Sequence, residues 1–396
     1  MHTVPVRDAD GGPIPYGRQD INDDDIAAVA EALRADYLTQ GPRVVAFEEA
    51  FARYVGARYA IAVANGTAAL HLCAHALGVR AGTRVITSPI TFAASGNCVR
   101  YCGGEVWFAD VDPMTLTLDL GATRELIESH PRGFFSGIIP VDFAGYPVDF
   151  VAFRELADEH DLWLVEDACH APGAARRYPD GTVRRSGSAG ADLAIFSFHP
   201  VKHIACGEGG MVTTDDERLA QRIRLLRSHG ITRDDTELEG VREGGWYMEM
   251  QELGYNYRMP DVLCALGMSQ LSRADAGLER RWAIAQTYDA AFATLDAVNT
   301  FATFGNDFDH AFHLYVIWVR DRKGLYDHLR DDGIYAQVHY IPLHKMPYYE
   351  RIGYEDAQLS QSEHYYEGGL SLPMYPTLTD SQQAYVIRSI ETFLQT

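Results

Sequence analysis

The stretch Leu193-Ala194-Ile195-Phe196-Ser197-Phe198-His199-Pro200-Val201-Lys202 leads from a continuous apolar segment into a lysine. An apolar run of this length, bounded by polar and turn residues, predicts a strand that is buried on both faces. A lysine just past a buried strand is well placed for desolvation. Because burial lowers the pKa of an amine and makes it nucleophilic, Lys202 is a candidate for chemistry. Taken alone, it also fits an exposed loop lysine.

Six more apolar runs accompany residues 193–198 between residue 58 and about residue 214, and helical stretches separate them. The six runs cover residues 59–63, 84–87, 106–108, 137–141, 162–165 and 211–213. Continuous apolar strands that alternate with amphipathic helices predict an α/β fold, with a mostly parallel seven-stranded sheet covered on both faces. Ligands of such sheets bind beyond the carboxyl ends of the strands.

The two ends of the chain differ from this pattern. Glycine and proline breakers predict an extended arm over residues 1–20. The cluster that begins at Asn22 caps a helix, whose predicted apolar face comprises Ile26, Val29, Ala30 and Leu33.

A strongly helical stretch near residues 258–295 is expected to bridge two domains. Strands near 313–319 and 335–341 and a terminal helix near 381–394 predict a smaller α+β unit. We expect three parts: an arm over 1–20, a large domain over 21–255, and the bridging helix with a small C-terminal domain over 256–396.

Composition restricts the possible partners and settings. The formal net charge of −21 argues against nucleic acid as a partner. No apolar signal core or membrane-spanning run is present, so no membrane partner is expected. The six cysteines form no CxxC pair and no ligand-like cluster with histidine, which predicts no metal site and a reducing, cytoplasmic setting.

Lysine is scarce, because Lys202, Lys323 and Lys345 are the three lysines among 396 residues. Arginine does not lose its proton in proteins, so chemistry that requires a deprotonatable amine has three candidates. Lys323 lies in a polar turn and Lys345 in a loop, whereas Lys202 follows a buried strand.

Other predicted strand ends offer companions for Lys202. Asp167 ends the run 162–165 and supplies a carboxylate of the kind that pyridoxal phosphate (PLP) needs at its pyridine nitrogen. In the turn Asn65-Gly66-Thr67, glycine permits close approach, and the N–H groups of the following helix bind a phosphate. Ser197 adds a hydroxyl, and Phe92 offers a stacking face. Taken singly, each also has an ordinary explanation. Asp167 could cap a turn, the turn at Gly66 could be a common helix start, Ser197 could be polar filler, and Phe92 could pack in the core.

The strings NGTAAL, VEDACHAPGA, SFHPVK…EGG and GYNYRMPDVLCALGMSQL, beginning at residues 65, 165, 197 and 254, resemble the sugar-nucleotide aminotransferases of the DegT/StrS type. These are fold-type I PLP-dependent enzymes, and the resemblance extends from Tyr16 to the C-terminus. It implies that Lys202 holds PLP as a Schiff base and later moves a proton, and that Asp167 pairs with the pyridinium.

The resemblance further implies that Gly66, Thr67 and Ser197 hold the cofactor phosphate. His170 replaces a glutamine that many members carry near the cofactor hydroxyl. Asn256 would reach the phosphate in the neighbouring subunit, so the minimum unit would be a homodimer with a shared active site.

Further segments resemble the branch of the family that acts on the route to pseudaminic acid. They surround Tyr16, Leu38, Thr39, His339 and Tyr340, which would line a sugar-nucleotide pocket. In isolation, a histidine on a strand is more often a core residue, and aromatic residues usually pack. The expected reaction moves the amino group of L-glutamate to C4 of a nucleotide-linked 4-keto-6-deoxy sugar.

Three alternatives remain open. A GDP- or dTDP-linked sugar would change the substrate but not the reaction. A PLP-dependent sugar dehydratase of this fold would carry histidine at the position of Lys202. A non-catalytic PLP-binding regulator would be expected to carry a DNA-binding segment or to lack part of the site.

Overall fold

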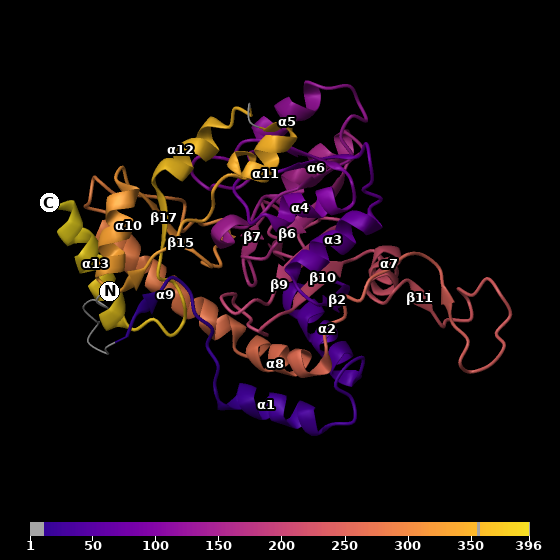
Figure 1. The fold of residues 1–396 in the computed structure, drawn as a ribbon. Coiled ribbons are helices and arrows are strands. Elements are labelled where there is room, and N and C mark those ends of the chain that lie inside the picture. Colours follow the sequence, from indigo (N-terminus) through magenta and orange to yellow (C-terminus); the bar gives the residue numbers. More distant parts are fainter. Residues whose placement is uncertain (1–11, 355–356, 396) are drawn as a thin grey trace.

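The computed structural model describes residues 12–354 and 357–395, and its centre is a seven-stranded sheet (Figure 1). In spatial order its strands are β2 (Tyr59–Val63), β10 (Gly210–Thr214), β9 (Leu193–Ser197), β6 (Trp163–Asp167), β5 (Gly137–Ile139), β3 (Arg84–Thr87) and β4 (Glu105–Phe108). Within this sheet β10 runs antiparallel to both neighbours, and all other pairings are parallel. The predicted α/β fold with a mostly parallel sheet is confirmed, and each predicted run contains a strand.

Both faces of the sheet are covered, as the continuous apolar strands predict. In β2, Ile61 and Val63 belong to one core cluster, while Ala60 and Ala62 belong to another. The first face packs against α3 (Gly66–Ala76), α4 (Ala94–Tyr101) and α7 (Glu217–Arg227). The opposite face packs against α2 (Pro42–Val55), α5 (Leu120–Glu128), α6 (Phe150–Glu159) and α8 (Asp261–Leu271).

The C-terminal part has its own core around a three-stranded antiparallel sheet, and Figure 1 shows it gathered on one side of the molecule. Its elements are β13 (Asn299–Thr300), β15 (Tyr315–Trp318), β17 (Gly369–Leu372), α9 (Ala274–Phe292), α10 (Arg322–Asp331), α12 (Ser360–Gly368) and α13 (Asp380–Leu394). The predicted bridging helix is two helices, α8 and α9, with a break at Ser272 and Arg273.

Short pairings complete the fold. They are β1 (Ile14–Pro15) with β16 (Ile334–Tyr335), β7 (Ala175–Arg177) with β8 (Val183–Arg185) and β14 (Phe308–Asp309), and β11 (Ile231–Thr232) with β12 (Glu249–Met250). The segment around β11 projects from the body of the molecule (Figure 1). Of the predicted arm, residues 1–11 lie outside the described residues. No helix in the described ranges has the length and apolarity needed to span a bilayer.

The predicted strand over residues 335–341 is wrong beyond Tyr335, where β16 ends. Gln337 still forms an isolated antiparallel bridge with Ser371 of β17, and ladder pairing then stops. The Gln337 side chain accepts a hydrogen bond from the N–H of Val338, and the hydroxyl of Tyr365 donates to the carbonyl of His339. Beyond this bridge, the side chain of His339 stays beside Ser371 of β17, whereas that of Tyr340 reaches His170.

The predicted apolar face of α1 (Asp23–Arg34) is largely open to solvent rather than buried in the core of this chain. Ile26 and Leu33 are each 59% exposed, whereas Asp25 is fully buried. The capping box at Asn22 is present as predicted. Asp25 points inward because Arg273 and Gln270 of the α8–α9 region donate hydrogen bonds to its carboxylate.

Candidate active site

The candidate active site lies where the parallel strands end. Gly66 and Thr67 begin α3 directly after β2, Asp167 is the last residue of β6, and Lys202 follows β9. Since β2, β6 and β9 run in the same direction, their carboxyl ends share one edge of the sheet. The predicted cofactor residues therefore come from neighbouring positions on this edge.

Asp167 is a buried carboxylate held by two donors. Its exposed fraction is 4%, the hydroxyl of Ser95 donates to Oδ2 at 2.7 Å, and the N–H of Cys169 donates to Oδ1 at 3.2 Å. These bonds fix its orientation at the end of β6. A carboxylate fixed in this way fits a protonated pyridine nitrogen, which needs an anionic acceptor.

A cradle for a phosphate lies between the start of α3 and Ser197. The side chain of Asn65 accepts from the N–H of Ala68 at 2.8 Å, while the N–H groups of Gly66 and Thr67 lie in the first helical turn, where no intrahelical acceptor exists. A Cβ atom added to Gly66 would lie 3.0 Å from Cβ and 3.4 Å from Oγ of Ser197. Any side chain at position 66 would crowd Ser197, so glycine keeps the N–H groups at the start of α3 open to an anion.

Lys202 directs its amine toward a cluster of imidazoles. Nζ lies 3.4 Å from Nε2 of His313, and the rings of His313 and His170 have centroids 4.2 Å apart. Although the side chain is only partly buried, desolvation lowers the pKa of Lys202, and the charges of Cys169 and Asp167 act in the opposite direction. The amine is thereby moved toward its nucleophilic, uncharged form.

His170 is buried and connects two segments. Its Nδ1 accepts a hydrogen bond from the N–H of Ala144 at 3.2 Å, and its Nε2 lies 3.3 Å from the hydroxyl of Tyr340. Burial, together with the nearby Lys202, lowers the pKa of His170 well below its usual value, so the ring is neutral. The accepting role of Nδ1 places the imidazole proton on Nε2.

Phe92 is 62% exposed, so the core-packing alternative for this residue is wrong. Its ring centroid lies 6.2 Å from that of Tyr340. A flat aromatic face that is open to solvent at a strand end fits a stacking partner for a planar ring.

Three of the predicted sugar-pocket residues lie together. The rings of Tyr16 and His339 have centroids 4.9 Å apart, and Tyr340 follows His339 directly. His339 is 6% exposed, and its Nδ1 lies 2.9 Å from the hydroxyl of Ser371. One nitrogen of His339 thus has the partner expected of a core histidine, while its ring still borders the predicted pocket.

Leu38, Thr39 and Asn256 are exposed. Within the described part of the chain, no hydrogen bond, ion pair or ring contact joins them to Lys202 or Asp167. Asn256 forms an isolated bridge with Ser228 instead. One subunit therefore does not assemble all of the predicted residues.

Two residues of the site, Ser95 and His313, were not predicted from the sequence. Ser95 contacts Asp167, and His313 contacts Lys202. The available signals were weak: Ser95 lies near the predicted helix start at Phe92, and His313 begins the apolar run at 313–319.

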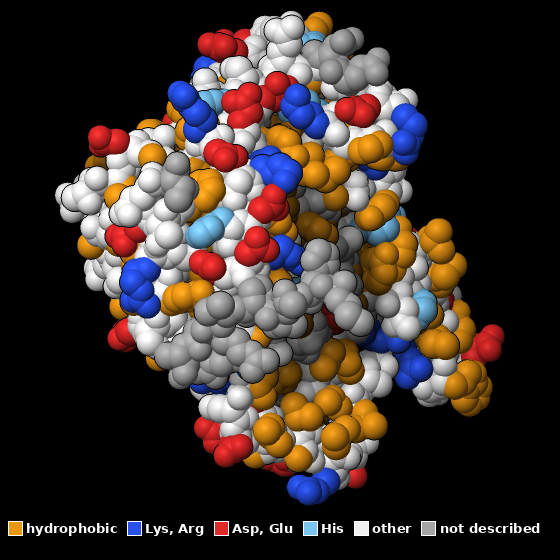
Figure 2. Space-filling model, turned by 60° about the vertical axis from the view of Figure 1, so that its left-hand side comes forward, with side chains coloured by type: hydrophobic (Ala, Val, Ile, Leu, Met, Phe, Trp, Pro, Cys, Tyr) orange, Lys and Arg blue, Asp and Glu red, His pale blue; other side chains and the backbone are white. Residues whose placement is uncertain are grey.

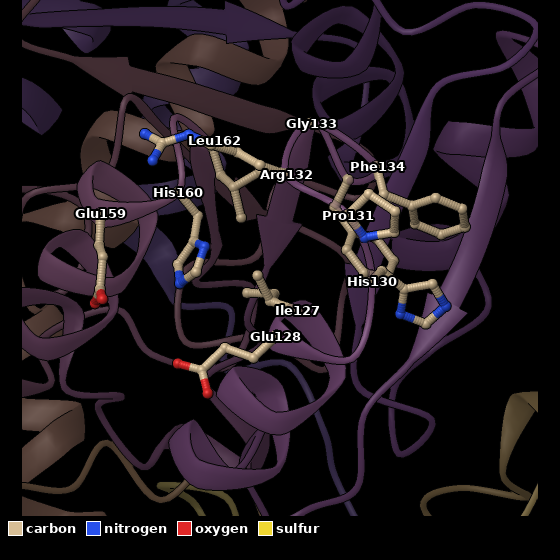
Figure 3. Close-up of a pocket in the computed structure, with 11 residues that line it drawn as sticks. Ile127, Glu128, His130, Pro131, Arg132, Gly133, Phe134, Glu159, His160 and Leu162 are labelled. Atoms are coloured by element: carbon tan, nitrogen blue, oxygen red, sulfur yellow. The ribbon is translucent and has the colours of Figure 1, made fainter.

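A separate cavity of about 310 Å³ lies at the ends of α5 and α6 (Figure 3). Glu128, Glu159 and His160 place potential ligand atoms within 4.8 Å of one another there. Nη1 of Arg124 already pairs with both carboxylates, at 3.3 Å and 2.8 Å. Neither the cavity nor this cluster includes a residue of the Lys202 site.

Comparison with known proteins agrees with this geometry. A family model described as the DegT/DnrJ/EryC1/StrS aminotransferase family matches residues 19–391. The chain belongs to this family. It is therefore a transaminase, and aminotransferases of this family depend on PLP, one solved member being in its PLP form.

Individual relatives of this DegT/DnrJ/EryC1/StrS aminotransferase cover almost the whole chain. A Campylobacter jejuni UDP-4-amino-4,6-dideoxy-N-acetyl-beta-L-altrosamine transaminase is 36% identical, with coverage of 96% of this chain and 98% of the relative. The spore coat polysaccharide biosynthesis protein SpsC of Bacillus subtilis is 37% identical, with coverage of 96% and 97%. A solved structure of Helicobacter pylori PseC, an aminotransferase involved in the biosynthesis of pseudoaminic acid, has a TM-score of 0.87 at 28% identity, covering 97% of this chain and 99% of that chain.

Proposed function

We propose that this aminotransferase moves the amino group of L-glutamate to C4 of UDP-2-acetamido-2,6-dideoxy-β-L-arabino-hex-4-ulose. The observation that carries the proposal is the edge of the sheet at which Lys202, Asp167 and the Gly66 cradle meet. The likeness to the Campylobacter jejuni transaminase, whose name states a UDP-linked amino sugar, supports the choice of sugar. A GDP- or dTDP-linked 4-keto-6-deoxy sugar is the alternative substrate, which would leave the reaction unchanged.

Each residue of the site has a task in this reaction. Lys202 holds PLP covalently and, as a free amine, carries a proton between the amino donor and the cofactor. Asp167 would keep the ring nitrogen protonated, and Phe92 would offer a stacking face to the ring. Gly66 and Thr67, together with Ser197, would hold the cofactor phosphate.

When bound, PLP supplies an electron sink that stabilises the negative charge left by loss of a Cα proton. The neutral ring of His170 donates through Nε2, which can reach a hydroxyl group on the cofactor. Tyr16, His339 and Tyr340 would contact the sugar nucleotide.

The active site is proposed to be shared between two subunits. Leu38, Thr39 and Asn256 are exposed in one chain and would complete the site of the partner subunit. Figure 2 shows hydrophobic side chains gathered at the lower end of the molecule, the end at which α1 lies in Figure 1. On and beside α1, the exposed large apolar side chains are Ile21, Ile26, Leu33, Tyr37 and Leu38. Burial of this surface would favour a homodimer.

Six free thiols favour a cytoplasmic setting for the protein.

The substrate is tested with purified enzyme, L-glutamate and a panel of UDP-, GDP- and dTDP-linked 4-keto-6-deoxy sugars. Mass spectrometry and NMR identify the amino sugar that forms. We expect turnover of the UDP-N-acetyl ketosugar and none with Lys202→Ala. Failure with this sugar, alongside success with another panel member, would overturn the substrate.

The shared site is tested by co-expressing Lys202→Ala and Asn256→Ala chains that carry different tags. Each homodimer is expected to be inactive or strongly impaired. The mixed dimer has one site that carries both substitutions and one site that carries neither, so it regains up to about half of the wild-type activity. A mixed dimer as inactive as the parents would exclude a site shared through Asn256.

A further inference from the structure

A second contact of Lys202 lies outside the residues expected to hold the cofactor. His313 belongs to the segment just before β15, and its Nε2 lies 3.4 Å from Nζ of Lys202. The His313 side chain is buried, with 4% exposure, and its Nδ1 has no hydrogen-bond partner among the described residues. Of its two nitrogens, therefore, the one with a partner is directed at the reactive amine.

The segment that carries His313 is fixed from several sides. Arg281, itself 1% exposed, donates from Nη1 to the carbonyls of Phe312 and Met374, each at 2.9 Å. Nε2 of His203 lies 2.7 Å from the carbonyl of Ala311. The N–H groups of Ala311 and Leu314 donate to Gly145 and Ala144, the latter being the residue that also binds His170. The backbone on both sides of His313 is thus held in place.

The environment selects one form of the His313 ring. Desolvation lowers the pKa of His313 well below its usual value, and the charges of Lys202 and Arg281 act in the same direction, so the ring is neutral. A neutral imidazole carries one proton. If that proton were on Nδ1, a buried N–H would lack an acceptor, which is rarer and costlier than a buried acceptor without a donor. The proton therefore belongs on Nε2, facing Lys202.

We propose that His313 is a positioning residue for the transamination: its Nε2–H donates to the lone pair of the free Lys202 amine and holds that amine uncharged and correctly aimed. An ammonium group has no lone pair to accept this bond, so the contact favours the neutral amine. The inference rests on the proposed role of Lys202 but not on the identity of the sugar.

Several other titratable groups surround the Lys202 amine and also influence its pKa. Cys169 and Asp167 favour its charged form, whereas desolvation opposes it. The Lys202 charge in turn helps to lower the pKa values of three further histidines, His170, His203 and His339. These groups are the same in the wild type and in a His313 variant, so the difference between the two isolates the His313 contact.

The scarcity of lysine makes the test direct. Cofactor-free full-length protein is labelled with trace acetic anhydride over a range of pH, and mass spectrometry follows the label on each lysine. Lys323 and Lys345 serve as references within the same molecule. Because a single hydrogen bond contributes on the order of 1 kcal/mol, His313→Leu is expected to raise the pKa of Lys202 by about one. His313→Gln, whose amide keeps an N–H donor, is expected to raise it less.

The matched control is His364→Gln, an exposed histidine whose replacement should leave the Lys202 labelling curve unchanged. Thermal unfolding of each variant checks that the fold is intact. An unchanged or lowered Lys202 pKa in a folded His313→Leu variant would overturn the proposal.

If His313→Leu does not fold, the wild-type protein still provides a test. Nitrogen-15 labelling of histidine reports by NMR which imidazole nitrogen carries the proton. A proton on Nε2 of His313 supports the proposal, and a proton on Nδ1, or on both nitrogens, refutes it. Neither measurement requires turnover. A failure of the proposed function is seen separately, as retention of the PLP absorption band by Lys202→Ala.

Discussion

Replacement of Glu166 by glutamine should make this protein less sensitive to rising pH. Glu166 and Asp142 are both fully buried beside the end of β6. The Asp142 carboxylate accepts from the hydroxyl of Ser186 at 2.6 Å, and Oε1 of Glu166 accepts from the N–H of Gly187 at 3.0 Å. Oε2 of Glu166 has no donor among the described residues. A proton on this oxygen would let it donate to Asp142, so the pair is expected to share a proton.

The magnitude follows from the pKa values. Burial raises the pKa of Asp142 from 3.8 to about 6, and burial together with the Asp142 charge raises the pKa of Glu166 well above 4.5. Both folded values exceed the unfolded ones, so the folded state binds more protons. The pair contributes its full stabilisation below about pH 4, and this contribution is lost as the pH rises through the folded-state pKa values. Each extra proton changes the free energy of unfolding by about 1.4 kcal/mol per pH unit.

Glutamine at position 166 can donate to Asp142 without titrating. As long as folded Glu166 keeps its proton, the unfolding free energy of Glu166→Gln should therefore fall less steeply with pH than that of the wild type. The difference amounts to about 1.4 kcal/mol per pH unit, in favour of the variant. For Asp142 alone, the rise in pKa by about two corresponds to about 3 kcal/mol.

Urea unfolding at pH 5, 6 and 7, at one protein concentration, measures these slopes. The exposed residue Glu125, replaced by glutamine, is the matched control, and its profile should parallel that of the wild type. Parallel profiles for Glu166→Gln and wild type, or a variant that loses relative stability as pH rises, would refute the shared proton.

Three further substitutions test separate parts of the structure. Asp25→Ala leaves the Arg273 guanidinium without its buried partner, and urea unfolding should show a loss of about 3 kcal/mol; a loss below about 1 kcal/mol would contradict this pairing. Gly66→Val places methyl groups against Ser197, so PLP titrations should show at least tenfold weaker binding, and unchanged affinity would exclude the cradle. Phe92→Ala should speed PLP release yet change unfolding stability by only about 0.5 kcal/mol, since the ring is exposed; a loss above 1 kcal/mol would assign it to the core.

The sheet was predictable because its signal is local and strong. A strand buried on both faces must be apolar throughout, so β2 and β3 begin and end where the apolar runs at 59–63 and 84–87 do. The positions of Asp167 and Lys202 follow from the same signal, because the end of a strand fixes where the next residues lie.

The remaining features depend on partners that are distant in sequence. Asp25 lies on the buried face of α1 because its carboxylate pairs with Arg273, and no local periodicity reveals this partner. The run at 335–341 has strand-like residues, but within it only Tyr335, which pairs in β16, and Gln337, which forms an isolated bridge with Ser371, find a partner strand. His313 contacts Lys202 only because the fold brings two distant segments together. From the sequence alone, this histidine could not be told apart from an ordinary core residue.

The pairing of β1 with β16 has a consequence for synthesis of the chain. Ile14 is 1% exposed and packs in the C-terminal core, with Ile334 opposite it in the parallel pair. During translation, Ile14 leaves the ribosome well before the residues that enclose it, which lie between Ile284 and Ile390. The large sheet can assemble while these residues are still being made, but the C-terminal core closes around Ile14 only after they have emerged. Until then Ile14 stays accessible to chaperones, and a stalled ribosome would hold a nascent chain with a formed sheet and an unfinished second core.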